Sequence, residues 1–409
     1  MKSEKIYLTV SQDYVQDWQF WEGIRELLQN MGDCEKYEYD TYNCQGDRWI
    51  SMKTFDGIIP RETLLLGNSG KREDNTKVGE HGEGYKMAFL VLTRMGYQVR
   101  IKNGFDKWVV TFDNHPQLHT ECLCVEILEN YYHVEDTDAD TVDITVQGLS
   151  QEDWDLLEDN YLKSDFMDWV GNGNLLVDHQ GCQIFRYDSD IHPEDREDLC
   201  DADSPKKVFV NGLFVCDLPN DYVFSYNLTP DRITLDRDRQ SVSTWDLQRE
   251  VATLLEDAGA FKLMVRMSEE KVPDLYEYYT PSRYKSVSSS CGSSSDRQTV
   301  NEVLNKLATE AFVKRHGEKA MAVNQDLHQS KRDIIKNRLK LGGYTPVEVP
   351  RTNFDMLDKS VTQVPECIPT NTATPKVMLK KYYEANKKHM RSKARKEMEK
   401  LIEDLILVS

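Results

Sequence analysis

Hydrophobic residues recur at helical spacing between residues 21 and 33. At about 100° per residue, four of them share one side of a helix: Trp21, Ile24, Leu28 and Met31. Glu26, Asn30 and Asp33 share the opposite side. A carboxylate and an amide one turn apart can orient a water and hold a hard cation. Polar residues opposite an apolar stripe are also typical of any surface helix, so the pattern predicts the helix and leaves the role of its polar face open.

Short strands are expected in the middle of the chain. Val208–Val210 and Leu213–Val215 flank the pair Asn211-Gly212. This pair is typical of a two-residue hairpin, because both central positions of the turn need positive φ. Two further short strands are expected, at residues 222–226 and 232–235.

One clear helix follows these strands, over residues 244–257. Ser243 is its expected N-cap, because a short hydroxyl side chain can accept from the free N–H groups of the first turn. Gly259 lies just past its end, where a left-handed residue commonly closes a helix. The middle segment is therefore expected to be a β-sheet with a helix laid on it.

A last amphipathic helix is expected near the C-terminus. Its apolar residues at helical spacing are Ala394, Met398, Leu401, Ile402 and Leu405. Between Lys376 and Lys400 there are ten basic and three acidic residues, so the solvent face is strongly positive. One interpretation is a solvated helix that packs on its own domain, and the other is a contact with nucleic acid or an acidic partner.

Charge is distributed unevenly along the 409 residues, whose formal net charge is −19. Residues 1–280 carry a net charge of −28, and residues 281–409 carry 24 basic and 15 acidic residues, a net charge of +9. The acidic residues 1–280 repel phosphate and are not expected to wrap nucleic acid. The basic residues 281–409 could still bind it. No apolar run is long enough for a membrane span. Nine scattered cysteines without a Cys-x-x-Cys pair favour reduced thiols and a cytoplasmic protein.

Composition divides the chain into four parts. A stretch rich in serine has the character of a flexible linker, and the chain beyond it is basic and helical in pattern. We expect an α+β protein with the following organisation: a first domain at 1–150, a second at 151–281, a linker at 282–298 and a helix-rich basic region at 299–409.

The segment Gly79–Lys86 contains three glycines and is followed at once by an apolar helical start. Glycines at the mouth of a helix expose backbone N–H groups at its positive end, which can cradle phosphate. The segment is not a P-loop, because no Gly-Lys-Ser/Thr closes it and no strand immediately precedes it. The alternative is that these glycines serve turns only. The polar stretch 67–75 before them is suited to a lid that closes on a ligand.

In this order the motifs resemble the ATP-binding domain of the GHKL superfamily, which includes gyrase, MutL and histidine kinases. Glu26-x-x-x-Asn30-x-x-Asp33 resembles its first motif, and Gly79-x-His81-Gly82-x-Gly84-x-Lys86 resembles its glycine-rich lid motif. The run Gly67-x-Ser69-x-Lys71-Arg72 is most similar to the Microrchidia branch and to phage and prokaryotic relatives. The resemblance implies a GHKL (Bergerat) α/β sandwich for residues 1–150, followed by a transducer-like α/β domain.

The resemblance also implies roles for individual residues. Asn30 would hold Mg²⁺, Glu26 would orient and deprotonate the attacking water, and Lys86 would contact the β- and γ-phosphates. The nucleotide-binding residues it implies are Asn30, Asp33, Asp56, Ser69, Lys71, Gly79, His81, Gly82, Gly84 and Lys86. ATP and Mg²⁺ are the expected ligands, and a homodimer is the expected assembly.

Two assignments stay open within this resemblance. The superfamily reads adenine with Asp-x-Gly-x-Gly, and here the aspartate position falls on Thr54 or, after a slip of two residues, on Asp56. We favour Asp56, because a carboxylate can accept from the adenine amino group. Arg237 or Arg239 could contact the γ-phosphate from the second domain, although alternating charges near a strand end are commonly surface ion pairs.

Two functions compete on this evidence. The first is an ATPase that uses hydrolysis to drive lid closure and a conformational change or dimerisation, acting on a protein or DNA partner through the basic C-terminal region. The second is a nucleotide-sensing interaction protein that binds ATP without significant turnover. A phage or bacterial source is expected from the Microrchidia-like motif, and the location is then the host cytoplasm if the chain is phage-encoded.

A zinc site is a further alternative for one short stretch. His115, His119, Cys122 and Cys124 lie within ten residues, and all four side chains can bind zinc. Their spacing is not that of a usual finger, and the alternation around Cys122 and Cys124 is read more simply as a strand.

Overall fold

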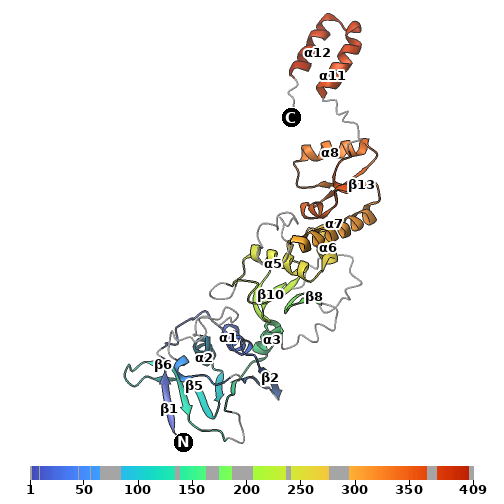
Figure 1. The fold of residues 1–409 in the computed structure, drawn as a ribbon. Coiled ribbons are helices and arrows are strands. Elements are labelled where there is room, and N and C mark those ends of the chain that lie inside the picture. The colour runs from blue at the N-terminus through green and yellow to red at the C-terminus, as the bar shows by residue number, and fades with distance from the viewer. Residues whose placement is uncertain are drawn as a thin grey trace. The chain divides into compact units, whose positions relative to one another are not determined.

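The computed structural model describes residues 2–8, 10–44, 46–55, 57–64, 84–133, 139–162, 175–186, 206–235, 241–275, 294–365 and 375–404. The chain forms two compact units, Met1–Glu250 and Val251–Ser409 (Figure 1). Antiparallel sheets and several helices confirm the expected α+β class. None of the helices within these ranges is long and apolar enough to cross a membrane.

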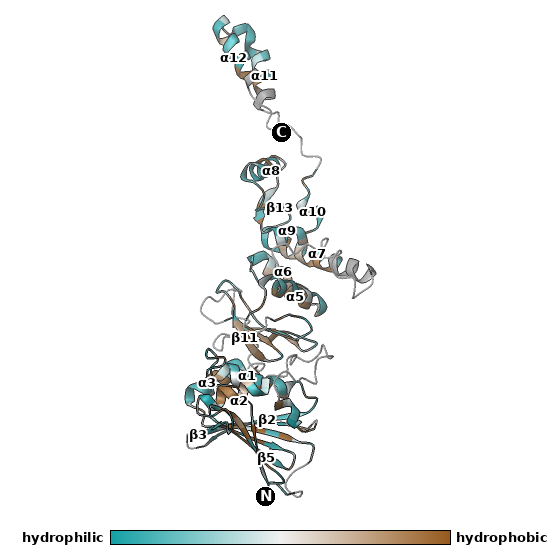
Figure 2. Cartoon of the chain, turned by 90° about the vertical axis from the view of Figure 1, so that its left-hand side faces the viewer, coloured by the Kyte–Doolittle hydropathy of each residue, from teal (hydrophilic) through white to brown (hydrophobic). Residues whose placement is uncertain are grey.

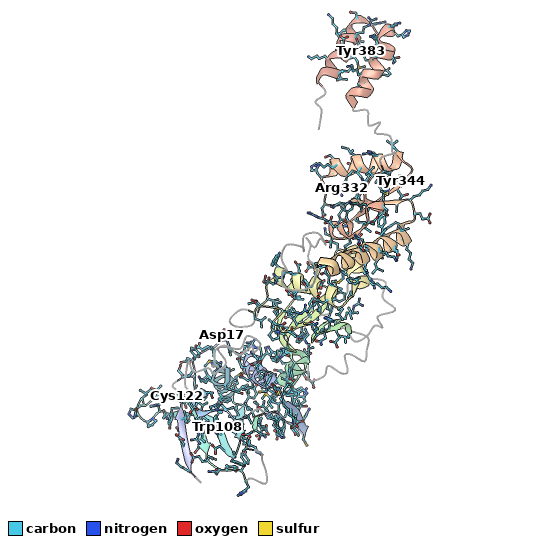
Figure 3. All side chains as sticks on the ribbon, viewed as in Figure 1. Asp17, Trp108, Cys122, Arg332, Tyr344 and Tyr383 are labelled. Carbon is cyan, nitrogen blue, oxygen red and sulfur yellow. The ribbon has the colours of Figure 1, made fainter. Side chains whose placement is uncertain are left out.

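A seven-stranded sheet forms the base of the first unit. Its order is β1-β6-β5-β4-β7-β3-β2, and every neighbouring pair is antiparallel. The strands are β1 (Ser3–Tyr7), β2 (Tyr37–Cys44), β3 (Asp47–Thr54), β4 (Gln98–Asn103), β5 (Asp106–Asn114), β6 (Glu121–Leu128) and β7 (Val142–Gln147). Trp108 on β5 is fully buried and lies among these strands in Figure 3.

Helices α1 (Phe20–Gly32) and α2 (Gly84–Arg94) pack against each other and contact the sheet. The predicted apolar stripe of α1 is buried, which confirms the helix that the periodicity predicted. Gly23 permits the close approach of the two helices, because a Cβ at this position would lie 3.1 Å from Leu92 Cγ. The guanidinium of Arg94 at the end of α2 donates to four carbonyl oxygens of the loop before α1: Gln12, Tyr14, Val15 and Trp18.

A second sheet, of five strands, follows helix α3 (Gln151–Asn160). Its order is β11-β10-β12-β9-β8, and β10 pairs parallel with β12. The strands are β8 (Leu175–His179), β9 (Cys182–Phe185), β10 (Lys207–Val210), β11 (Leu213–Asp217) and β12 (Ser225–Leu228). Leu213 of this sheet belongs to the same buried cluster as α1, so the two sheets of this unit share core contacts.

The middle segment tests several sequence predictions. The Asn211-Gly212 hairpin is confirmed, with φ of 51° and 83° at the two turn residues. Helix α5 (Thr244–Asp257) has the predicted bounds. The strand expected at 222–226 lies instead at β12, and the one expected at 232–235 does not form, since Leu235 makes only an isolated bridge to Val242.

The second unit contains two strands that the sequence analysis did not predict. β13 (Ala320–Asn324) and β14 (Thr345–Val349) pair in parallel and are joined through α8 (Gln329–Leu341). The other elements are α6 (Phe261–Glu270), α7 (Ser294–His316), α9 (Arg351–Met356), α10 (Lys359–Thr362), α11 (Pro375–Asn386), the 3₁₀ turn η5 (Lys387–His389) and α12 (Ser392–Asp404). Helix α7 begins at Ser294, inside the range expected to be a linker, and residues 282–293 of that range lie outside the described residues.

Candidate functional site

The polar face of α1 carries the first group of candidate residues. Glu26 is buried, with 9% of its surface exposed, and Asn30 is half-buried one turn later. The Asn30 Nδ2 donates to the Glu26 carbonyl oxygen at 2.8 Å, which fixes the orientation of the amide on the helix. Asp33 is the C-cap residue of α1, so all three residues lie at the C-terminal half of one helix.

Gly84, the last glycine of the glycine-rich segment, meets this polar face. A Cβ at Gly84 would lie 2.8 Å from Glu26 Oε2 and 3.2 Å from Asn30 Nδ2. Real Cβ contacts are essentially never shorter than 3.0 Å, so the position accepts only glycine without a shift of the carboxylate. The N-terminus of α2 therefore lies directly against the Glu26 and Asn30 side chains, although 57 residues lie between Glu26 and Gly84 in sequence. Helices α1 and α2 are side by side in Figure 1.

Two buried cations accompany this contact. Lys86, in the first turn of α2, has no exposed surface, and Arg25 is 3% exposed. The Arg25 Nη2 lies 3.8 Å from Glu26 Oε1. Buried charges are tolerated only when other groups compensate them. The Glu26 carboxylate and the Arg25 guanidinium are therefore expected to compensate each other. Arg25 was missed by the sequence analysis, because its position between the polar and apolar faces of the helix gave no signal.

Tyr85 links the start of α2 to the end of α1. Burial raises the pKa of the Tyr85 hydroxyl above its ordinary value, and the nearby Cys34 and Asp33 add to this effect. Its ring also stacks on Phe89, with 6.0 Å between the ring centroids. The end of α1 therefore lies near Tyr85 in the first turn of α2.

The segment expected to read adenine follows β3. Asp56 lies outside the described residues, whereas its neighbour Gly57 has φ of 116° and donates from its N–H to the Asp140 carbonyl oxygen at 3.1 Å. Asn103 at the end of β4 fixes the next turn through two hydrogen bonds with Ile59. The Asn103 Oδ1 accepts from the Ile59 N–H, and the Asn103 Nδ2 donates to the Ile59 carbonyl oxygen. The Thr54 alternative lies in β3, opposite Val142, so the choice between Thr54 and Asp56 stays a prediction.

Several other candidates fall outside the described residues. These are Ser69, Lys71, Gly79, His81 and Gly82 of the lid, and Arg237 and Arg239 of the second sheet region. Their roles stay predictions. Of the glycine-rich segment, the structure thus describes Gly84 and Lys86, and it brings Gly84 against the side chains of α1.

The stretch considered for zinc forms ordinary secondary structure. Cys122 and Cys124 are buried in β6, as the alternation predicted. His115 instead uses Nδ1 to accept from the N–H groups of Gln117 and Leu118. Within the described residues, no three His, Cys, Asp or Glu side chains gather in a way that could hold a metal ion.

Comparisons with known proteins give limited results. Residues 185–260 match the family model described as the Mycoplasma pneumoniae MPN635 N-terminal domain, a stretch that includes β10, β11, β12 and α5. No curated protein matches the chain. Among solved structures, the chain is weakly similar to the B-subunit of the DNA gyrase from Myxococcus xanthus, with 9% identity and a TM-score of 0.23 over 59% of this chain and 88% of that chain.

Proposed function

We propose that this chain is an ATPase of the GHKL type, with its nucleotide site between α1 and the N-terminus of α2. The observation that carries the proposal is the contact at Gly84, where a Cβ would lie 2.8 Å from Glu26 Oε2. Two motifs far apart in the sequence meet there, which supports their assignment to one site. A helix N-terminus beside a carboxylate and an amide is suited to a phosphate chain with a metal ion.

Asn30 is chemically suited to hold Mg²⁺. Its Nδ2 donates to the Glu26 carbonyl oxygen, so the Oδ1 is the side-chain atom that would bind the metal. An amide oxygen is one of the hard ligands that Mg²⁺ accepts beside phosphate oxygens and water. Bound there, the ion would neutralise charge on the phosphates.

The chain's own residues would divide the remaining work. Glu26 would orient the attacking water and accept its proton, while Arg25 at 3.8 Å restrains the carboxylate. The N–H groups at the start of α2 and the Lys86 ammonium would attract the phosphates, which is the usual division of labour in phosphoryl transfer. Ser69, Lys71, Gly79, His81 and Gly82 would form the closing lid, with Arg237 or Arg239 contacting the γ-phosphate. Lid closure would then drive dimerisation or a conformational change.

Substitution of Glu26 tests the proposal. Glu26→Ala should retain ATP binding, measured by titration calorimetry, and lose roughly 10²- to 10⁴-fold in hydrolysis, the usual contribution of a positioned general base. Glu22→Ala is the matched control, since Glu22 caps the same helix one turn earlier by accepting from the Gln19 N–H. It should hydrolyse ATP at the wild-type rate. Unchanged turnover in Glu26→Ala would remove Glu26 from the role. ATP binding without turnover in the wild-type protein would favour the nucleotide-sensing alternative.

A further inference from the structure

The C-terminal helical hairpin, formed by α11, η5 and α12, has almost no core of its own. Helix α11 packs on α12, and the Tyr383 hydroxyl donates to the Glu399 carboxylate. Among the described side chains of residues 379–402, Tyr383 alone is buried. Figure 3 shows Tyr383 within the hairpin, and Figure 2 shows α11 and α12 to be mostly hydrophilic. The hairpin thus presents nearly all of its side chains to solvent.

The tip of this hairpin, residues 387–396, carries no acidic residue. Its six cations are Lys387, Lys388, Arg391, Lys393, Arg395 and Lys396. Lys387 pairs with Glu384 at 2.5 Å, and the Arg395 Nε donates to the Met390 carbonyl oxygen at 3.1 Å. The other four are exposed, and among the described residues none of them has a carboxylate within ion-pair distance. Four uncompensated positive charges therefore project from the tip.

The fold places these charges where they repel one another and the helix itself. Two of the six cations, Lys393 and Arg395, lie in the first turn of α12, which contains no acidic residue, and Lys396 follows directly. The N-terminus of a helix carries a partial positive charge, so cations there are unfavourable and an anion is favourable. A bound polyanion would relieve both repulsions.

The composition of the tip favours duplex DNA over other polyanions. Four of its six cations are lysines, which are depleted at the cores of protein interfaces, and the tip has no aromatic anchor for a protein partner. Single-stranded nucleic acid is usually held by stacking on Phe, Tyr or Trp, and the tip has none of these. An exposed helix such as α12 fits the major groove of B-form DNA, whereas the deep, narrow groove of A-form RNA excludes it.

We propose that residues 387–396 bind the phosphate backbone of double-stranded DNA. The proposal lies outside the part of the chain that resembles GHKL proteins, and it does not depend on the nucleotide site. Four phosphate contacts predict a slope of about −3.6 for the logarithm of the binding constant against the logarithm of salt concentration, or a loss of about 10² in affinity between 50 and 200 mM.

The proposal is tested by fluorescence anisotropy of the full chain with a labelled duplex of about 30 base pairs. The binding constant is measured at several salt concentrations between about 50 and 200 mM, which gives the salt slope. The combined variant Lys388→Ala, Arg391→Ala, Lys393→Ala and Lys396→Ala should flatten the salt dependence and weaken binding at 50 mM by about tenfold or more. Alanine favours helix, so circular dichroism should show α12 retained.

A control variant removes the same charge from the same unit, by alanine at the exposed residues Lys314, Lys319, Lys331 and Lys340. It should bind the duplex as the wild type does, and so should Glu26→Ala, which separates this proposal from the one on ATP hydrolysis. The proposal is overturned if the tip variant keeps wild-type affinity and salt slope, or if the control loses as much. Tighter binding of duplex RNA, single-stranded DNA or polyglutamate than of duplex DNA would also overturn it.

Discussion

Because Gly84 lies so close to Glu26, we predict that one added methyl group at Gly84 lowers the rate of hydrolysis and changes stability little. In Gly84→Ala the new Cβ would lie 2.8 Å from Glu26 Oε2, whereas ordinary contacts begin at 3.4 Å. The carboxylate oxygen must therefore move by about 0.6 Å. Because it is the end of a flexible side chain, a rotation of about 30° suffices and costs about 0.5–1.5 kcal/mol. Alanine regains up to about 1 kcal/mol of helix propensity, so the free energy of unfolding should change by about 1 kcal/mol or less.

Hydrolysis should respond far more strongly than stability. A displacement of about 1 Å at a reacting group can reduce a rate about 10²-fold, so a shift of about 0.6 Å should lower kcat by about 10- to 100-fold. Steady-state phosphate release measures kcat, and urea unfolding measures stability in the same preparation. A general loss of structure would lower kcat and stability together, whereas the displaced carboxylate should lower kcat alone.

Gly32→Ala is the matched control for this experiment. It adds one Cβ at the end of α1, where the nearest atom would be Asn211 Nδ2 at 3.6 Å, an ordinary contact. Its kcat should therefore stay within about twofold of wild type, since no reacting group has to move. Wild-type hydrolysis by Gly84→Ala would refute the assignment of Glu26 to the site, and a loss that merely follows the unfolded fraction would refute the geometric argument.

Two further predictions concern the seven-stranded sheet. Gly104→Ala should lower the free energy of unfolding by about 2–4 kcal/mol in urea, because φ is 57° and the Cβ would lie 2.7 Å from the Ala139 carbonyl oxygen, which cannot move without the backbone. Burial raises the pKa of the Cys124 thiol from 9.0 to about 11. Native protein at pH 8 should therefore be alkylated at exposed Cys44 and protected at Cys124. The stabilisation from the protonated Cys124 is present below pH 9 and should decline as pH rises from 9 to 11, so a flat urea midpoint over that range would contradict it.

Local signals in the sequence were sufficient for some elements. The apolar stripe predicted α1, and the Ser243 cap and Gly259 gave the bounds of α5. The Asn211-Gly212 hairpin followed from the φ values that its turn requires. In each case the information lies within a few residues, where helix periodicity and turn chemistry act directly.

Nonlocal contacts account for what the sequence did not show. The parallel pairing of β13 with β14 depends on a partner about 25 residues away, and an apolar run as short as Ala320–Val323 does not distinguish strand from helix. The burial of Arg25 and the clamp of Asn103 on Ile59 likewise depend on which segments the fold brings together. The motif order suggested that Gly84 and Glu26 belong to one site, whereas the 2.8 Å approach required the fold.

The charge of the chain poses a physical problem for a nucleotide site between α1 and α2, since residues 1–280, which contain both helices, carry a net charge of −28. Long-range attraction of ATP by the surface is therefore unfavourable. Among the described candidate residues, the positive charge lies inside the fold, on Arg25 and Lys86, which are 3% and 0% exposed. Coulomb interactions of buried groups are stronger and less screened by salt than those at the surface. Phosphate binding would thus rest on these two cations, Lys71 of the lid, the N–H groups of α2 and a bound metal. The exposed cations of residues 387–396 work by the opposite principle, because their attraction reaches into solvent and weakens as salt is added.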